Sequence, residues 1–332
     1  MWGNKRGWIF SSVIIFVTVA GLWMLFLAGQ PTPPSWDAAK QAKFLAAIDP
    51  PNFFDPNKQD LVPMPTKPGD SGNAYRKAIA DFQAHKDDYL QFVPSKKDEE
   101  LEGFRDLLNG AEFSGMTLLG DHPEEYVGFD EKGMAPLTAL KHVAQAMESR
   151  AMFMIKNDKL DEAKKYLEAD FILGVKLWNE RVVWDELFVG SGRMSAGAVG
   201  LRIIADHQKE KDTKRITELQ AFDGARQKYM TDMILPLWTM THNLEPSDAG
   251  NLFLLAQKAS EPMWRVEAIR QLARLRWNAG SSLPSDQHHA VWVLRKLAAK
   301  DPNPVIRSIA DKASTVTLEE LQQEVKDFSQ SQ

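Results

Sequence analysis

An uncharged apolar run near the N-terminus constrains this chain more than any other feature. From Trp8 to Ala28, WIFSSVIIFVTVAGLWMLFLA, the sequence holds 21 residues without a charged side chain. As an α-helix the run would be roughly 32 Å long, about the thickness of the hydrocarbon core of a bilayer. A run that is apolar on every side has no polar face to turn towards water, which disfavours an ordinary core helix. We therefore predict a single transmembrane helix at residues 8–28.

Basic residues on one side of this run predict its orientation. Lys5 and Arg6 come just before it, and the next basic residue is Lys40. Under the positive-inside rule, residues 1–7 stay in the cytoplasm and the rest of the chain crosses the membrane. The expected location is a bacterial inner membrane, spanned once, with the C-terminal domain on the periplasmic side.

A cleaved signal peptide is the alternative reading of the N-terminus. The apolar region of a signal peptide is usually about 7–15 residues long, which is shorter than this run, and an A-x-A-like cleavage site is poorly formed here. The residues LAGQ, from Leu27 to Gln30, resemble a bacterial lipoprotein box, but Gln30 stands where the lipid-bearing cysteine is required. We therefore expect an uncleaved signal anchor.

Proline separates the anchor from the rest of the chain. Residues 29–72 hold nine of the 18 prolines, interrupted by one short helix expected from Ser35. This composition predicts an extended, semi-rigid linker. From Asn73 onward, apolar residues recur at helical spacing and almost never alternate as in a strand. The expected fold class is all-α, with one helical domain at 73–250 and further helices at 251–332.

One expected helical hairpin resembles a known repeat. The stretch LTALKHVAQAMESRAMFMIKNDKLDEAKKYLEADFILGVKLW breaks at Asn157 and Asp158 and then resumes helical spacing. Asp158, Leu160, Ala163 and Leu167 take the places of the turn glycine, the aromatic residue, the alanine and the bulky residue of tetratricopeptide repeats (TPR). The resemblance covers about 40 residues and implies two antiparallel helices joined by a short turn.

Two C-terminal segments resemble HEAT repeats. KASEPMWRVEAIRQLARL and AAKDPNPVIRSIADKAST share an acidic residue followed by proline, and Pro262 and Pro302 are 40 residues apart. In the first segment Val266 is kept, but Glu267 stands where the family has arginine. The second follows the family pattern D-P-x-x-x-V-R through Asp301, Pro302, Ile306, Arg307 and Ala310. The implied architecture is a superhelix of TPR-like and HEAT-like hairpins.

A run of small residues, RMSAGAVGLRII, has two interpretations. Its G-A-V-G-L core resembles part of the signature of lytic transglycosylases, which cut the bacterial cell wall with a single glutamate. Glu186 lies 11 residues before Gly197 and is the candidate catalytic residue, but the serine that follows this glutamate in the family is missing. The same letters fit a helix whose small residues, with Ala196 and Gly200 four apart, let another helix approach. We favour the packed helix.

Composition argues against several classes of function. The chain has no cysteine, which rules out disulfides, thiolate metal sites and cysteine nucleophiles. A formal net charge of -5 gives no dominant basic surface for nucleic acid. None of the seven histidines forms an H-E-x-x-H zinc motif, and the sequence has no phosphate-binding glycine loop and no dinucleotide fingerprint. We expect no metal, no cofactor and no enzymatic activity.

The C-terminal helices are basic within an acidic chain. Their cations form either a solvated face or one docking patch for an acidic partner, anionic lipid or an anionic wall polymer: Arg265, Arg270, Arg274, Arg276, Arg295, Lys296 and Arg307. Stacked helical hairpins present broad surfaces that suit binding more than chemistry. The expected function is a membrane-anchored extracytoplasmic scaffold for protein partners. The alternatives are a cell-wall-cleaving enzyme of the lytic transglycosylase type and a helical module that binds a small ligand.

Overall fold

The computed structural model describes residues 54–58, 61–95, 101–118, 127, 135–208, 213–242, 249–277 and 284–320. These residues are mostly helical, which confirms the all-α prediction. The predicted transmembrane segment 8–28 lies outside them. Within the described part of the chain, no helix is both long enough and apolar enough to cross a membrane.

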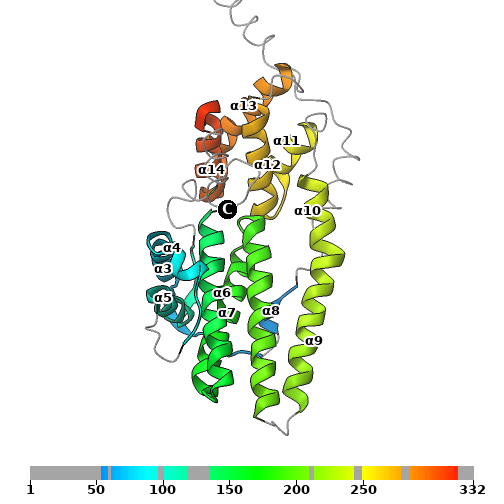
Figure 1. Cartoon of the computed structure of the whole chain (residues 1–332). Helices are drawn as coiled ribbons and strands as arrows, with labels where there is room; N and C mark the ends of the chain where they lie inside the picture. Colours follow the sequence, from blue (N-terminus) through cyan, green and yellow to red (C-terminus); the bar gives the residue numbers. More distant parts are fainter. Residues whose placement is uncertain are drawn as a thin grey trace, which may run out of the picture.

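Long antiparallel helices form the centre of the molecule (Figure 1). Neighbours in the chain pack against each other in this bundle: α6 (Ala135–Lys156), α7 (Leu160–Glu180), α8 (Trp184–His207) and α9 (Thr213–Tyr229). A π-helical turn at Met230–Ile234 joins α9 to α10 (Leu235–His242). Pro236 lies two residues after this turn, and because proline has no N–H to donate, it accounts for the local change of helix type.

Three shorter helices cover one side of the bundle: α3 (Gly72–Ala84), α4 (Lys86–Leu90) and α5 (Glu102–Ala111). α3 packs against α6, and α5 packs against α7. Beside them, β1 (Lys67–Asp70) pairs in parallel with β2 (Phe113–Gly115). The strands and a 3-10 turn at Pro56–Lys58 are additions to the expected all-α fold. Strands this short cannot display an alternating pattern in the sequence.

Four helices stack on one end of the bundle as two hairpins, α11 (Ala249–Lys258) with α12 (Pro262–Leu275) and α13 (Pro284–Lys300) with α14 (Pro304–Thr315). Proline suits the first helical position because its φ is already helical and no N–H is needed there. Since α12 and α14 begin at Pro262 and Pro304, the two segments are 42 residues apart rather than 40. In this corrected register Arg265, not Glu267, is equivalent to Arg307.

An aromatic contact and an ion pair join these end helices to the bundle. The rings of Trp184 on α8 and Trp264 on α12 are buried together, with centroids 4.2 Å apart. Arg181, in the turn between α7 and α8, donates from Nε to Glu261 Oε2 at 2.8 Å. The bundle and the C-terminal helices therefore share one hydrophobic core.

The end of the predicted linker belongs to this core. Trp178 Nε1 donates to the carbonyl of Phe54 at 2.8 Å, and the Phe54 ring lies 5.6 Å from that of Phe222. Leu61 and Val62 are buried as well. The predicted linker boundary at residue 72 is therefore too late, because the apolar residues between these prolines pack onto the bundle. Residues 29–53 lie outside the described part.

The turn between α6 and α7 falls where the sequence predicted it. Asp158 has a positive φ of 58°. Its N–H donates to the Ile155 carbonyl at 3.1 Å, and the N–H of Lys159 donates to the Met154 carbonyl at 2.9 Å. This is the hydrogen-bond pattern of a helix that ends on a left-handed residue. Aspartate tolerates that conformation better than most residues, so it can occupy a turn position where glycine is more usual.

Close packing of α7 against α8 explains the run of small residues, which lies inside α8. A Cβ added to Gly174 of α7 would lie 2.7 Å from the carbonyl oxygen of Gly190, and one added to Gly190 would lie 2.8 Å from that of Gly174. A Cβ on Gly197 would come equally close to the backbone of α7, and Gly200 also touches that helix. The helical interpretation is confirmed, although the contact uses these glycines more than the half-buried Ala196.

Gly190→Ala is expected to lower the free energy of unfolding by about 1–3 kcal/mol, because its methyl group would force α7 and α8 apart. The matched control is Gly192→Ala on the same helix, where an added Cβ meets nothing within 4 Å. That substitution is expected to stabilise by up to about 1 kcal/mol through helix propensity. Urea unfolding followed by circular dichroism measures both variants. Equal effects would contradict the close-packing explanation.

Candidate functional site

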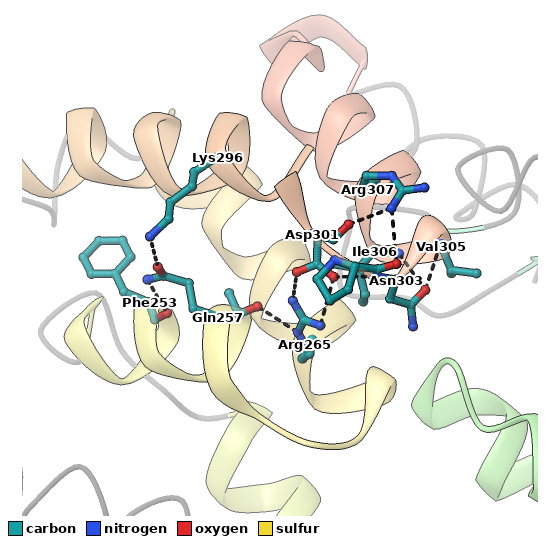
Figure 2. Close-up of polar contacts among 11 residues, drawn as sticks. Phe253, Gln257, Arg265, Lys296, Asp301, Asn303, Val305, Ile306 and Arg307 are labelled. Carbon is teal, nitrogen blue, oxygen red and sulfur yellow. Dashed lines mark hydrogen bonds and ion pairs between the residues drawn. The ribbon is translucent and has the colours of Figure 1, made fainter. Parts of the chain in front are cut away.

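Two arginines of the predicted cationic patch are buried within the C-terminal hairpins and form ion pairs there. Arg265 on α12 is buried, and its guanidinium pairs with Asp301, which follows α13 directly (Figure 2). Nη1 donates to Asp301 Oδ1 at 3.2 Å, and Nη2 donates to Asp301 Oδ2. Nε donates to the Ala256 carbonyl of α11 at 3.0 Å. One arginine thereby ties α11, α12 and the end of α13 together.

Arg270 is buried in a second internal pair. Its Nη1 lies 3.3 Å from Glu267 Oε2, and Glu267 Oε1 accepts from Gln271 Nε2 at 3.0 Å. Arg274, one turn further along α12, is half-buried. The predicted docking role is therefore wrong for Arg265 and Arg270, because a buried charge needs a partner and both find theirs inside the fold.

Two further arginines of the predicted patch bind helix ends. Arg307 Nη1 donates to the carbonyls of Asp301 at 2.7 Å and Pro302 at 3.2 Å (Figure 2). Arg276 Nη1 donates to the carbonyl of Ala313, in the last turn of α14, and to that of Val316, just after the helix, at 3.4 Å. The last carbonyls of α14 have no partner within the helix, so Arg276 satisfies them and offsets the negative end of the helix dipole, whereas Arg307 binds carbonyls of the turn between α13 and α14.

The two remaining cations of the patch, Arg295 and Lys296, lie on the surface of α13. Together with His288 and Trp292 they are exposed. Since successive residues of an α-helix are about 100° apart, these four positions fall on one side of α13. Residues 287–300 contain no acidic side chain. We name these four residues, His288, Trp292, Arg295 and Lys296, the α13 face.

Contacts with neighbours fix the aromatic part of the α13 face. The ring of Trp292 stacks on His289 with centroids 5.3 Å apart, and Lys296 Nζ lies 4.9 Å from the Trp292 ring centroid. Lys296 Nζ also donates to Gln257 Oε1 at 3.1 Å, while Gln257 Nε2 donates to the Phe253 carbonyl at 3.0 Å (Figure 2). Helix α11 therefore helps to set the position of the Lys296 amine on α13.

A second exposed tryptophan, Trp277, lies just after α12. Trp277 donates from Nε1 to the Val316 carbonyl at 3.2 Å, and the Arg276 guanidinium lies 5.3 Å from its ring centroid. Leu318, two residues after Val316, is exposed too. Burial, and then the nearby charge of Arg295, lower the pKa of Arg276. The aromatic and cationic surface therefore continues from the α13 face to the end of α12.

The candidate catalytic residue Glu186 closes a turn in the interior. It is fully buried in the first turn of α8, and its Oε2 accepts from Val182 N at 2.5 Å and from Val183 N at 3.3 Å. Burial, and then the charge of Glu180, raise the pKa of Glu186 well above its ordinary range. The carboxyl satisfies backbone donors at the start of the helix, as capping glutamates do. A sugar could touch it only if the turn opened.

A buried charge network lies behind a groove on α6. Arg193 Nη1 of α8 lies 3.3 Å from Glu148 Oε2 and 3.4 Å from Asp170 Oδ2. The open groove has a volume of about 470 Å³ and is lined by Pro94, Gln145, Glu148, Ser149, Met152, Phe153 and Lys156. Asp170 is fully buried behind it, and its Oδ1 has no hydrogen-bond partner among the described residues. The groove has the volume of a small-ligand site.

Asp170→Asn is expected to stabilise the protein at pH 8 and to have little effect near pH 4. Burial raises the pKa of Asp170 from 3.8 to about 7, against the opposing charge of Arg193. A raised carboxyl pKa gives stability that is complete below pH 3.8 and is lost as the pH rises through about 7. The pKa difference between the unfolded and folded states corresponds to at most about 4 kcal/mol of stability.

Urea unfolding at several values between pH 4 and pH 8 measures the effect of Asp170→Asn. Asp206→Asn, at an exposed position of α8, is the matched control and should leave the pH dependence unchanged. If the unfolding free energy of Asp170→Asn depends on pH as strongly as that of the natural protein, the raised pKa assigned to Asp170 is wrong.

Lys176 is another buried charged residue, on α7. Its Nζ donates to the carbonyls of Gly110 at 2.8 Å and Phe113 at 2.5 Å, and to Ser71 Oγ at 3.2 Å. Burial lowers the pKa of Lys176 to about 8, against the attraction of Asp70. This lysine ties the end of α5, the start of α3 and strand β2 to the bundle.

Sequence reasoning missed these buried charges, although the sequence carries a signal for them. Asp170 and Lys176 both lie in the otherwise apolar stretch ADFILGVKLW. A charge within such a stretch is either paired in the interior or marks a site. Trp292 shares one helical face with Arg295 and Lys296, a spacing that points to the surface.

Among the residues that the structure describes, no three His, Cys, Asp or Glu side chains are grouped so that they could hold a metal ion. The exposed tryptophans and cations of α12 and α13 are thus the described feature best suited to recognising another molecule. No protein-family model, no curated protein and no solved structure matches this chain.

Proposed function

We propose that this protein is a membrane-anchored extracytoplasmic scaffold that binds protein partners through its C-terminal helices. One observation carries the proposal: Trp277, just after α12, and Trp292, on α13, are both 41% exposed and lie beside cations. The other large apolar side chains described on these two helices are buried or half-buried. Tryptophan and arginine are enriched among the residues that dominate binding energy at protein interfaces. A partner that covers these rings accounts for their position.

The rigidity of the C-terminal hairpins supports this function. Arg265 joins three helical segments, and Arg276 and Arg307 bind helix ends. A surface that is already ordered loses less conformational entropy when a partner binds. The membrane anchor rests on the apolar run at residues 8–28 and on the cations before it.

Affinity purification of the full-length protein from detergent-solubilised membranes, followed by mass spectrometry, tests the scaffold function. We expect specific proteins with extracytoplasmic domains to be retained, and Trp292→Ala to reduce their recovery. Leu235→Ala is the matched control, since Leu235 is a comparably exposed apolar residue on α10. If no protein is retained, or if both variants behave alike, the proposal is wrong.

A cell-wall-cleaving enzyme that uses Glu186 has weaker support, because its carboxyl is buried and already bound to backbone N–H groups. Glu186→Gln keeps an acceptor for those groups and replaces a carboxyl whose pKa is raised by burial. Under the scaffold proposal this variant retains its partners and changes stability by less than about 1 kcal/mol. Hydrolysis of purified cell wall by the natural protein, lost in Glu186→Gln, would instead establish the enzyme.

Binding of a small ligand in the α6 groove is supported by the groove volume of about 470 Å³. Native mass spectrometry of the full-length protein tests this second candidate. A bound small molecule that Met152→Glu removes would support it, since Met152 lines the groove. A ligand unaffected by that substitution would bind elsewhere.

A further inference from the structure

We infer that the α13 face binds an acidic segment of a partner protein that also carries an apolar side chain. This inference rests on the proposed scaffold function and names the chemistry of the partner. It is carried by the four exposed residues of the α13 face, His288, Trp292, Arg295 and Lys296, and by the contacts that hold two of them in place.

The charges of the α13 face are available to an acidic partner. Arg295 is exposed and has no carboxylate partner among the described residues. Lys296 donates to Gln257, a neutral amide, so its positive charge is not cancelled. The chain as a whole carries a net charge of -5, which makes a cationic face on it distinctive. Complementary charge speeds the encounter with an acidic partner and excludes basic ones.

The apolar contact is supplied by Trp292, which is 41% exposed. Its ring lies against His289 and close to the Lys296 amine, so both its position and that of the cation are set before binding. An acidic residue that reaches Lys296 therefore places its neighbour in the partner chain next to the indole. Lys296 and Trp292 together therefore bind a carboxylate and a neighbouring apolar side chain.

The fixed geometry favours a polypeptide over a lipid surface. The Trp292 ring packs against His289 and Lys296, and Lys296 also donates to Gln257 of α11, so both side chains are positioned before a partner binds. Lysines at a bilayer surface extend along flexible stems to reach headgroups. A peptide of defined sequence can match two fixed groups, and the ordered side chains lose little entropy when it does.

Fluorescence anisotropy of the full-length protein in detergent micelles tests the inference. The probe is a fluorescein-labelled oligoglutamate peptide with one central phenylalanine. The variant Arg295→Glu with Lys296→Glu reverses both charges on the exposed face, and Lys165→Glu reverses an exposed lysine on α7 as the matched control. We expect the double variant to lose at least about tenfold in affinity and the control to bind like the natural protein. Trp292→Ala should weaken binding of this peptide more than that of oligoglutamate alone.

Several outcomes would overturn the inference. One is peptide binding that the double variant and Lys165→Glu weaken equally. Another is the absence of peptide binding together with attachment to vesicles containing phosphatidylglycerol that the double variant abolishes, which would identify a lipid surface instead. Partners that co-purify with the natural protein and equally with the double variant would leave the scaffold function intact and reject this site. A lack of any co-purifying protein would reject the scaffold function itself.

Discussion

Lys176→Met is expected to lower the free energy of unfolding by about 3–5 kcal/mol, because it leaves buried acceptors without a donor. The Lys176 amine serves the carbonyls of Gly110 and Phe113 and the hydroxyl of Ser71. Methionine fills a similar volume but donates nothing. The loss should be concentrated where α3, α5 and β2 meet the bundle.

Urea unfolding gives the size of this effect, and hydrogen exchange of the amides at residues 110–117 gives its location. Lys165→Met is the matched control, since Lys165 lies on the same helix but is exposed. It should change stability by less than about 0.5 kcal/mol. If Lys176→Met costs no more than this control, the lysine does not hold the region together.

Asp301→Ala is expected to lower the free energy of unfolding by about 3–5 kcal/mol, because it leaves the buried Arg265 guanidinium without its carboxylate. Arg265→Met should cost a similar amount for the converse reason. The double substitution removes both charges, so it should cost much less than the sum of the two single substitutions. A double-mutant cycle of unfolding free energies measures this coupling.

An exposed pair provides the comparison for this cycle. Lys159 Nζ and Glu162 Oε1 lie 3.6 Å apart near the start of α7, and both side chains are more than half exposed. Their coupling should be below about 1 kcal/mol, because solvent screens exposed charges. If the effects of the Arg265 and Asp301 substitutions on the unfolding free energy are additive, this ion pair does not stabilise the C-terminal hairpins.

The sequence predicted the helices well because their signals are local. Helical spacing of apolar residues predicted an all-α fold, and the break at Asn157 and Asp158 predicted the turn between α6 and α7. Small residues at helical spacing predicted close packing, which the structure places at Gly190 and Gly197. Each of these features depends on residues that are neighbours on one helix.

What the sequence did not predict depends on contacts between distant residues. Arg265 and Asp301 are 36 positions apart, so nothing local distinguished this arginine from a surface cation such as Arg295. Phe54 packs against Trp178, 124 positions later, and this contact draws part of a proline-rich stretch into the core. The pairing of β1 with β2 could not be predicted from strands of three or four residues.

Crosslinking from the position of Trp292 tests the scaffold account most directly. A photoreactive phenylalanine replaces Trp292 in the full-length protein, which is then irradiated in intact cells and purified with whatever it has captured. The same substitution at the exposed position Lys165 on α7 is the control. The account predicts a defined protein adduct from position 292 whose peptide at the crosslink is rich in Asp or Glu, and no such adduct from position 165. Adducts from position 165 alone, or the same products from both positions, would contradict it.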